Sequence, residues 1–254
     1  TFSSPAVYLP LFFGILALVL FSIRQYKLEE PVLDITVFKF PMFTLGIVLF
    51  LIVLMAMFSS EIILPIYMQE VLALSAAASG LILLPGSLVS GLMSPFMGRL
   101  FDHLGPRKII IPATLLLSVT MFAFSRFGLQ TPVWMIIVGY ILLLVSVSGI
   151  MMPAETNGLN ELPKRYYPHG TAMMSTLQPV FGAIGVSLFV SLLSARQNHF
   201  LTNSENPADP ETIKNALVAG VELVYFISLG LSVLAFLISL FIYRAMPEEE
   251  IEHR

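Results

Sequence analysis

The sequence predicts an all-α integral membrane protein with seven transmembrane helices. Of its 254 residues, 57% are hydrophobic and 11% are charged, whereas a soluble domain carries about 25% charged residues. The mean hydropathy is +0.88. Seven runs contain no Asp, Glu, Lys or Arg, and each is 17 residues or longer. Because a helix needs about 20 apolar residues to cross the hydrocarbon core, each run is long enough for one span.

In chain order, the uncharged runs occupy residues 5–23, 40–60, 71–98, 109–125, 127–154, 166–195 and 223–243. A backbone in lipid must satisfy its own hydrogen bonds, so each run is expected to be a helix. A β-barrel would show alternating segments of about 10 residues instead. The fourth and fifth runs are divided only by a short segment with Arg126, Gly128 and Pro132, which is typical of a tight turn.

The distribution of Lys and Arg predicts the orientation of the spans. Ten of the 13 basic residues fall on one side if the second, fourth and sixth connections from the N-terminal end are assigned to the opposite side. Basic residues are enriched in cytoplasmic loops. We therefore expect a multi-pass protein of the plasma membrane with a cytoplasmic C-terminus.

Several function classes are excluded by what the sequence lacks. The absence of Cys excludes disulfides and Cys-ligated zinc, and the histidines show no metal-ligand spacing. A net charge of −3 gives no footprint for nucleic-acid binding. No HExxH, GxSxG or P-loop motif is present, so neither an enzyme nor an ATP-driven pump is expected. The chain begins at Thr1, which we interpret as a fragment whose N-terminal part is missing.

The segment between the third and fourth runs carries the most specific motif. Residues 98–108 read GRLFDHLGPRK, and the motif positions are Gly98, Leu100, Asp102, Gly105, Arg107 and Lys108. This pattern resembles the loop signature of the major facilitator superfamily. Phe101, His103 and Pro106 depart from the usual small, Arg and Arg residues, so the segment resembles a weakened copy of the kind found in the second half of such proteins.

Three further segments, residues 30–38, 63–86 and 160–172, are similar to the fourteen-helix drug:proton antiporter family of that superfamily. The resemblance implies a linker helix and cytoplasmic linker in residues 1–39. It implies the C-terminal six-helix transporter bundle in residues 40–247 and a cytoplasmic tail in residues 248–254. The partner would be the N-terminal half of the same protein, which is absent here.

The function implied by this resemblance is a bacterial proton-coupled secondary exporter that performs multidrug efflux by alternating access. Its partners would be amphipathic small molecules, protons and the lipid bilayer, with the proton gradient as the energy source and no cofactor. One alternative is the same fold exporting a specific metabolite or a lipid-like compound. A seven-helix receptor is a remote alternative. A retinal protein needs a Schiff-base Lys in its last span, and residues 223–243 contain none.

Two acidic residues have both a functional and a structural interpretation. Asp102 is either a solvated carboxylate paired with Arg107 or Lys108, or a conformational latch that faces a helix N-terminus of the other half. Glu61 follows 21 uncharged residues, so we expect it just under the outer surface, with Gln69 beyond it. An acid at membrane depth suggests a proton or substrate site. The alternative is an interfacial residue that reaches the outer water.

Small residues at intervals of about four positions predict close helix packing in the third and sixth spans. These positions are Gly86, Ser90, Ser94, Gly182, Gly185 and Ser187. They are either static helix–helix contacts or faces that rock against each other during transport.

Overall fold

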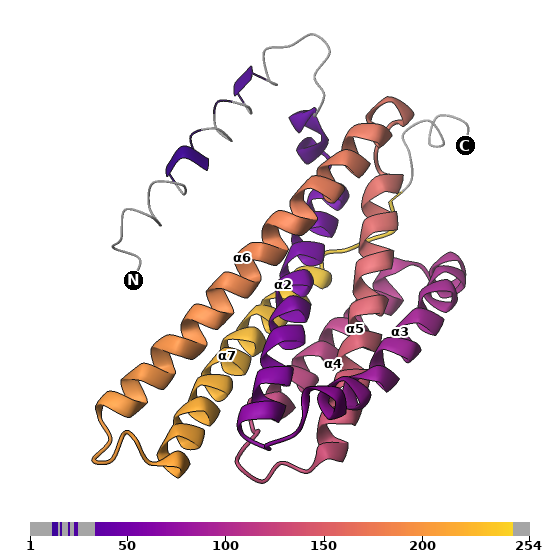
Figure 1. Cartoon of the computed structure of the whole chain (residues 1–254). Helices are drawn as coiled ribbons and strands as arrows, with labels where there is room; N and C mark the ends of the chain where they lie inside the picture. Colours follow the sequence, from indigo (N-terminus) through magenta and orange to yellow (C-terminus); the bar gives the residue numbers. More distant parts are fainter. Residues whose placement is uncertain (1–11, 15, 17–19, 21–22, 25–33, 246–254) are drawn as a thin grey trace.

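The computed structural model describes residues 12–14, 16, 20, 23–24 and 34–245, and from residue 34 onward these form a helical bundle (Figure 1). The elements are η1 (Ile35–Lys39), α2 (Pro41–Glu70), α3 (Ala76–Leu104), α4 (Pro106–Phe124), α5 (Val133–Asn160), η2 (Lys164–Tyr166), α6 (Tyr167–Thr202) and α7 (Pro210–Ser239). Each of the six α-helices is long and apolar enough to cross a membrane. The predicted all-α membrane fold is therefore confirmed. The predicted first span, residues 5–23, lies mostly outside the described residues.

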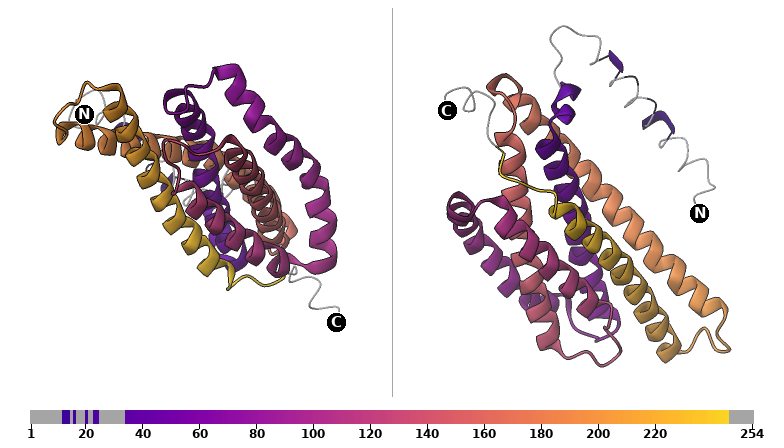
Figure 2. Two further views of the ribbon diagram at one scale, coloured as in Figure 1. Left: turned by 90° about the horizontal axis from the view of Figure 1, so that it is seen from below. Right: turned by 180° about the vertical axis from the view of Figure 1, so that it is seen from behind.

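Helices α2 and α5 form the centre of the bundle. Helix α2 packs against α5, α6 and α7, while α5 packs against α2, α3 and α4. The pairs of neighbours are largely kept if α2–α4 exchange places with α5–α7, although α6 packs much more extensively against α7 than α3 does against α4. Helices α3 and α6 lie at opposite edges, as both Figure 1 and Figure 2 show. The arrangement is that of two three-helix units that share one core.

Aromatic side chains hold the end of the bundle at which the α4–α5 turn lies. The rings of Tyr67 and Phe127 stack with centroids 5.4 Å apart, and Phe124 packs against Tyr225 at 5.0 Å. The Tyr67 hydroxyl donates a hydrogen bond to the carbonyl of Gly128 in the turn, at 2.5 Å. The predicted tight turn is thereby fixed to α2 and α7 through buried side chains.

The helices are longer than the uncharged runs from which they were predicted. Helix α7 begins at Pro210, thirteen residues before residue 223, because the Asp209 side chain accepts a hydrogen bond from the backbone N–H of Thr212 and Pro210 suits the first turn. The connection between α6 and α7 is accordingly residues 203–209. Polar helical turns extend beyond the hydrocarbon core because their side chains remain in water.

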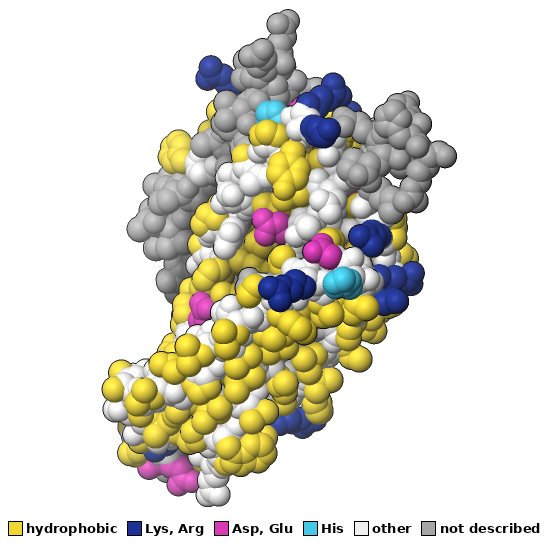
Figure 3. Space-filling model, turned by 90° about the vertical axis from the view of Figure 1, so that its right-hand side faces the viewer, with side chains coloured by type: hydrophobic (Ala, Val, Ile, Leu, Met, Phe, Trp, Pro, Cys, Tyr) yellow, Lys and Arg dark blue, Asp and Glu magenta, His cyan; other side chains and the backbone are white. Residues whose placement is uncertain are grey.

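The side of the bundle on which α3 lies is broadly hydrophobic (Figure 3). On α3 the exposed side chains include Leu81, Leu88, Leu92 and Phe96. In this view Lys and Arg side chains lie at the top of the bundle and in a belt across its middle, and the surface below that belt is mostly hydrophobic. An apolar face bounded by charged ends is typical of a chain that crosses a bilayer.

Candidate functional site

The motif at residues 98–108 is almost entirely helical rather than a loop. Helix α3 continues to Leu104, Gly105 alone separates the two helices, and α4 begins at Pro106. Gly105 has a φ of 76°, a conformation that side-chain-bearing residues rarely adopt. Pro106 suits the first helical position because it lacks the N–H that would be unpaired there. The motif therefore supplies the connection between the two helices with a single glycine.

Each charged motif residue lies at the helix end where the helix dipole disfavours its charge. Asp102 is exposed in the last turn of α3, and Arg107 and Lys108 are exposed in the first turn of α4. A helix dipole favours the opposite arrangement by about 0.3–1 kcal/mol per charge. In the described part of the chain, Asp102 forms no ion pair with either basic residue. These charges therefore do not stabilise the junction that carries them.

One of the three departures from the motif pattern, Phe101, has a packing role. Phe101 is buried against Met97 and Ile109, and Leu100 and Met152 lie at the edge of this cluster. The cluster joins the end of α3 to the start of α4 and to α5. A residue larger than usual at position 101 thus fills the inner side of the junction and leaves Asp102 on its outer side.

Glu61 lies well inside α2 rather than at its end. It is in α2 nine residues before the last residue, Glu70, which places it about 13 Å along the axis from the helix end. Gln69 is exposed in the last turn, at the end of the span. The helix extends past Glu61 because eight of the nine residues from Ile62 to Glu70 are uncharged.

Glu61 of α2 has a polar neighbour on α5, and that residue has a polar neighbour on α3. Tyr140 of α5 is close enough to interact electrostatically with the Glu61 carboxylate, and Ser87 of α3 lies near the Tyr140 hydroxyl. Tyr140 is 5% exposed, whereas Glu61 is only partly buried. The cluster of Glu61, Tyr140 and Ser87 combines an ionisable group with two hydroxyls at membrane depth, which is chemistry that can bind a proton or a cation.

The predicted small residues occupy two kinds of surface. A Cβ on Gly86 would meet the ring of Tyr140 at 2.5 Å, and the Ser90 hydroxyl lies 3.1 Å from that of Ser148 of α5. On α6, a Cβ on Gly182 would meet Phe58 at 2.8 Å and one on Gly185 would meet the backbone of Met55 at 3.0 Å. These four positions lie at close helix crossings.

The other two positions differ. Ser187 lies on an open surface of α6 that includes Ala183, Ser191 and Ala195. Ser94 belongs to α3, but its side chain lies outside the described part of the structure. The structure therefore separates internal crossings from a small-residue face that no described helix covers.

The sequence did not indicate two polar side chains that join the opposite end of the bundle. The Glu161 carboxylate accepts hydrogen bonds from the backbone N–H groups of Met42 at 2.7 Å and Phe43 at 3.0 Å. These are unpaired donors in the first turn of α2, whose N-cap residue, Phe40, has no acceptor. Burial raises the pKa of Glu161, and the two backbone N–H groups counter part of that rise.

Asn157 is the second polar side chain that joins this end of the bundle. It is 2% exposed, its amide nitrogen donates to the carbonyl of Tyr243 at 3.0 Å, and its Oδ1 accepts from the N–H of Ala245 at 3.0 Å. The end of α5 thus holds both the start of α2 and the segment that follows α7. Neither contact had a sequence signal, because the partners are 86 to 119 residues apart.

We predict that Glu161→Ala lowers the thermal stability of the protein. The substitution removes the only side-chain cap of α2, and loss of such a cap costs roughly 1 kcal/mol, or about 2–4 °C in a protein of this size. The midpoint of thermal unfolding in detergent measures the effect. Glu205→Ala is the matched control because Glu205 is exposed in the α6–α7 loop. Equal midpoints for the two variants would contradict the capping role.

The family of this chain follows from its sequence similarity. A family profile described as Major Facilitator Superfamily matches residues 4–186. The chain belongs to the major facilitator superfamily. The match includes the α3–α4 junction and Glu61, so the two sites described above lie in a transporter scaffold.

Three bacterial relatives extend the comparison over nearly the whole chain. The lincomycin resistance protein LmrB of Bacillus subtilis is 42% identical over 242 residues, which are 95% of this chain and 50% of LmrB. The protein of the same name from Listeria monocytogenes is 43% identical over 95% of this chain and 51% of its own length. The uncharacterised MFS-type transporter YcnB of B. subtilis is 37% identical over 93% of this chain and 48% of its own. The chain thus spans about half the length of the curated relatives it matches.

Proposed function

We propose that this chain is the C-terminal half of a proton-coupled exporter that removes amphipathic drugs from a bacterial cell by alternating access. The strongest support is its 42–43% identity to two lincomycin resistance proteins over 95% of its length. The polar cluster around Glu61 supplies an ionisable group of the kind that such an exporter requires. A specific metabolite or a lipid-like compound as the substrate of the same fold is the alternative.

Helices α3 and α6 have large faces that the rest of the bundle does not cover, and these faces support the proposal of a partner domain. In the apolar 18-residue stretch of α2, 61% of the residues are buried within the bundle, against 11% in that of α3 and 22% in that of α6. The uncovered face of α6 carries Ser187, Ser191 and two alanines, and small residues permit close approach of another helix. We propose that the N-terminal half covers these faces, with the substrate between the halves.

A drug-efflux assay with the full-length protein tests this function. We expect a bacterial strain without its own exporters to gain resistance to lincomycin and to extrude a cationic dye when it expresses the protein. A protonophore should abolish extrusion because the proton gradient supplies the energy. Resistance and extrusion at the level of the empty vector would refute drug export and favour the metabolite alternative.

The distribution of basic residues also leads us to propose that the α3–α4 junction and the C-terminus face the cytoplasm. An alkaline phosphatase reporter, which is active only outside the cytoplasm, should be inactive when inserted after Arg165 and active at Asn206. The second position lies in the α6–α7 loop, at the other end of the bundle. Activity in the reverse order would overturn the orientation.

We propose that Asp102 is a latch that contacts the other half in one conformation of the transport cycle. Its exposure and its unfavourable place at the end of α3 support this role. We expect Asp102→Asn to leave expression unchanged and to slow efflux by about tenfold, which corresponds to loss of roughly 1.4 kcal/mol from one charge-assisted contact. Initial rates of dye efflux at matched expression measure this. Asp209→Asn at the start of α7 is the control, and equal rates for both would make Asp102 an ordinary surface charge.

A further inference from the structure

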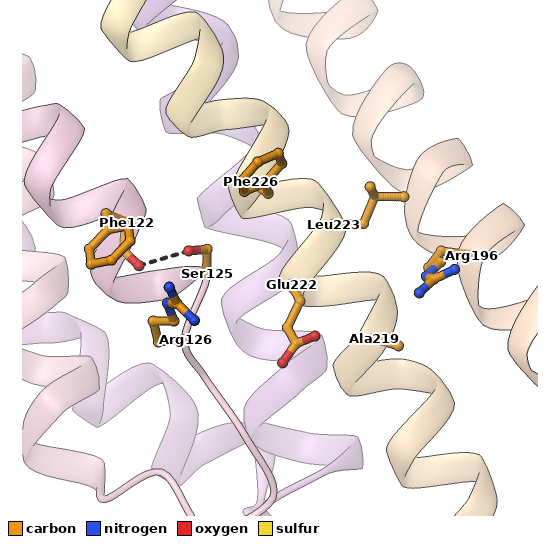
Figure 4. A pocket seen from close by; sticks show the side chains of 8 residues that line it. All are labelled: Phe122, Ser125, Arg126, Arg196, Ala219, Glu222, Leu223 and Phe226. Atoms are coloured by element: carbon orange, nitrogen blue, oxygen red, sulfur yellow. Dashed lines mark hydrogen bonds between the residues drawn. The ribbon is translucent and has the colours of Figure 1, made fainter.

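A charged hollow of about 600 Å³ lies between α4, α6 and α7, near the end of the bundle at which the α6–α7 loop lies. Its walls include Phe122 and Arg126 of the α4 end, Arg196 of α6, and Glu222 and Phe226 of α7 (Figure 4). It is distinct from the Glu61 cluster and from the α3–α4 junction. Neither the proposed export function nor the latch uses these residues.

The charges in this hollow are free to meet a ligand. Arg126, Arg196 and Glu222 are all exposed, and among the described residues neither Arg forms an ion pair with Glu222. The Arg126 guanidinium lies over the Phe122 ring, 5.0 Å from its centroid, which holds it at the rim. Two cations and one carboxylate are therefore available within one hollow.

Along both α4 and α7, the hollow is charged at one end and apolar at the other, and the charged end is the same for the two helices. Phe122 of α4 lies one helical turn from Arg126, and Phe226 of α7 lies one turn from Glu222. In both cases the Phe is farther from the α6–α7 loop than the charged residue is. The two rings are 48% and 65% exposed. The exposed apolar stripe continues inward along α4 through Val119 and Leu115, and along α7 through Val233 and Leu237. In a bilayer that these helices span, the charges would lie toward the interface and the large apolar side chains would extend from them into the hydrocarbon region.

This surface differs from the one that we assign to the other half of the protein. The open face of α6 carries a row of alanines and serines at Ala183, Ser187, Ser191 and Ala195, beside Ile184, Leu188 and Leu192, and such a row suits close contact with a helix. The α4 and α7 stripes consist of Leu, Val and Phe, which suit flexible acyl chains. A headgroup with one anion and one ammonium group would complement the two arginines and the carboxylate.

We propose that this hollow binds a phosphatidylethanolamine molecule of the adjacent leaflet. Its phosphate would contact Arg126 and Arg196, its primary ammonium group would donate to Glu222, and its acyl chains would lie along the α4 and α7 stripes. Phosphatidylcholine has no N–H to donate to Glu222. Phosphatidylglycerol has no cationic group. Its phosphate would contact the two arginines, but it would offer no ammonium group to Glu222.

Native mass spectrometry of the purified full-length protein tests the proposal with three lipids of identical acyl chains: phosphatidylethanolamine, phosphatidylcholine and phosphatidylglycerol. We expect the ethanolamine lipid to bind about tenfold more tightly than the other two. The double variant R126Q/R196Q should weaken its binding by about tenfold. Glu222→Gln should remove the preference over phosphatidylglycerol while leaving phosphatidylglycerol bound.

Lys214→Gln and Glu211→Gln are the controls, because they change one charge of each sign at the same end of α7 without altering the hollow. They should retain the wild-type preference. Equal binding of the three lipids by the wild-type protein, or an unchanged preference in the double variant and in Glu222→Gln, would overturn the proposal. Thermal midpoints without lipid establish that each variant is folded before binding is compared.

Discussion

Substitution of Gly46 by leucine should abolish most of the folded protein. A Cβ at this position would lie 2.7 Å from the backbone carbonyl oxygen of Ala154 and 3.6 Å from the Cα of Gly158. These are backbone atoms of α5, so no side-chain rotation can relieve the clash, and the two central helices would have to separate. Gly46→Ala should cost about 1–3 kcal/mol, the usual range for overpacking, and the larger leucine more.

The yield of monodisperse protein after detergent extraction, together with the midpoint of thermal unfolding, measures this effect. Gly230→Ala is the matched control because Gly230 is a helical glycine with nothing within 4 Å of its added Cβ. The control should keep the wild-type midpoint or raise it slightly, since alanine favours a helix more than glycine does. A normal yield of Gly46→Leu would show that the α2–α5 crossing is looser than the structure indicates.

The sequence was sufficient to predict the class of fold and the succession of α2 to α7. Uncharged runs report directly on the hydrocarbon core, which excludes charge whatever the tertiary structure is. The uncharged runs do not mark where the helices end, because capping and other polar contacts stabilise helical turns that extend into water. From the run at residues 223–243, Glu222 is expected to open its helix, yet it lies twelve residues inside α7.

Contacts between distant parts of the chain explain most of what the sequence did not predict. Glu161 resembles a solvated acid of a polar connection, and only the fold brings it to the start of α2. Arg126 is typical of a turn residue, and its hollow exists because α4 packs beside α7. The sequence marks Glu61 as an acid that follows a long uncharged run, but it cannot show that Tyr140 of α5 lies near it or that Ser87 of α3 lies near Tyr140.

Substitution of Glu61 by glutamine should produce the largest loss of transport. The change keeps the shape of the side chain and removes its charge, about 13 Å from the end of α2 and beside Tyr140. Under the proposed function, the Glu61 carboxylate would attract a drug cation, and a proton that neutralises it would release that cation. We expect resistance to cationic drugs to fall by at least tenfold and resistance to neutral drugs to fall less.

The pH dependence of efflux distinguishes a coupling site from a residue that only shapes the cavity. If Glu61 exchanges the driving proton, efflux by Glu61→Gln should vary less with external pH than efflux by the wild-type protein, since glutamine does not titrate. Glu70→Gln is the matched control on the same helix, because Glu70 is exposed at its end. Unchanged resistance to both drug classes across pH would make Glu61 a residue without a transport role. The proton site would then be expected in the N-terminal half that we propose, across the faces that α3 and α6 leave open.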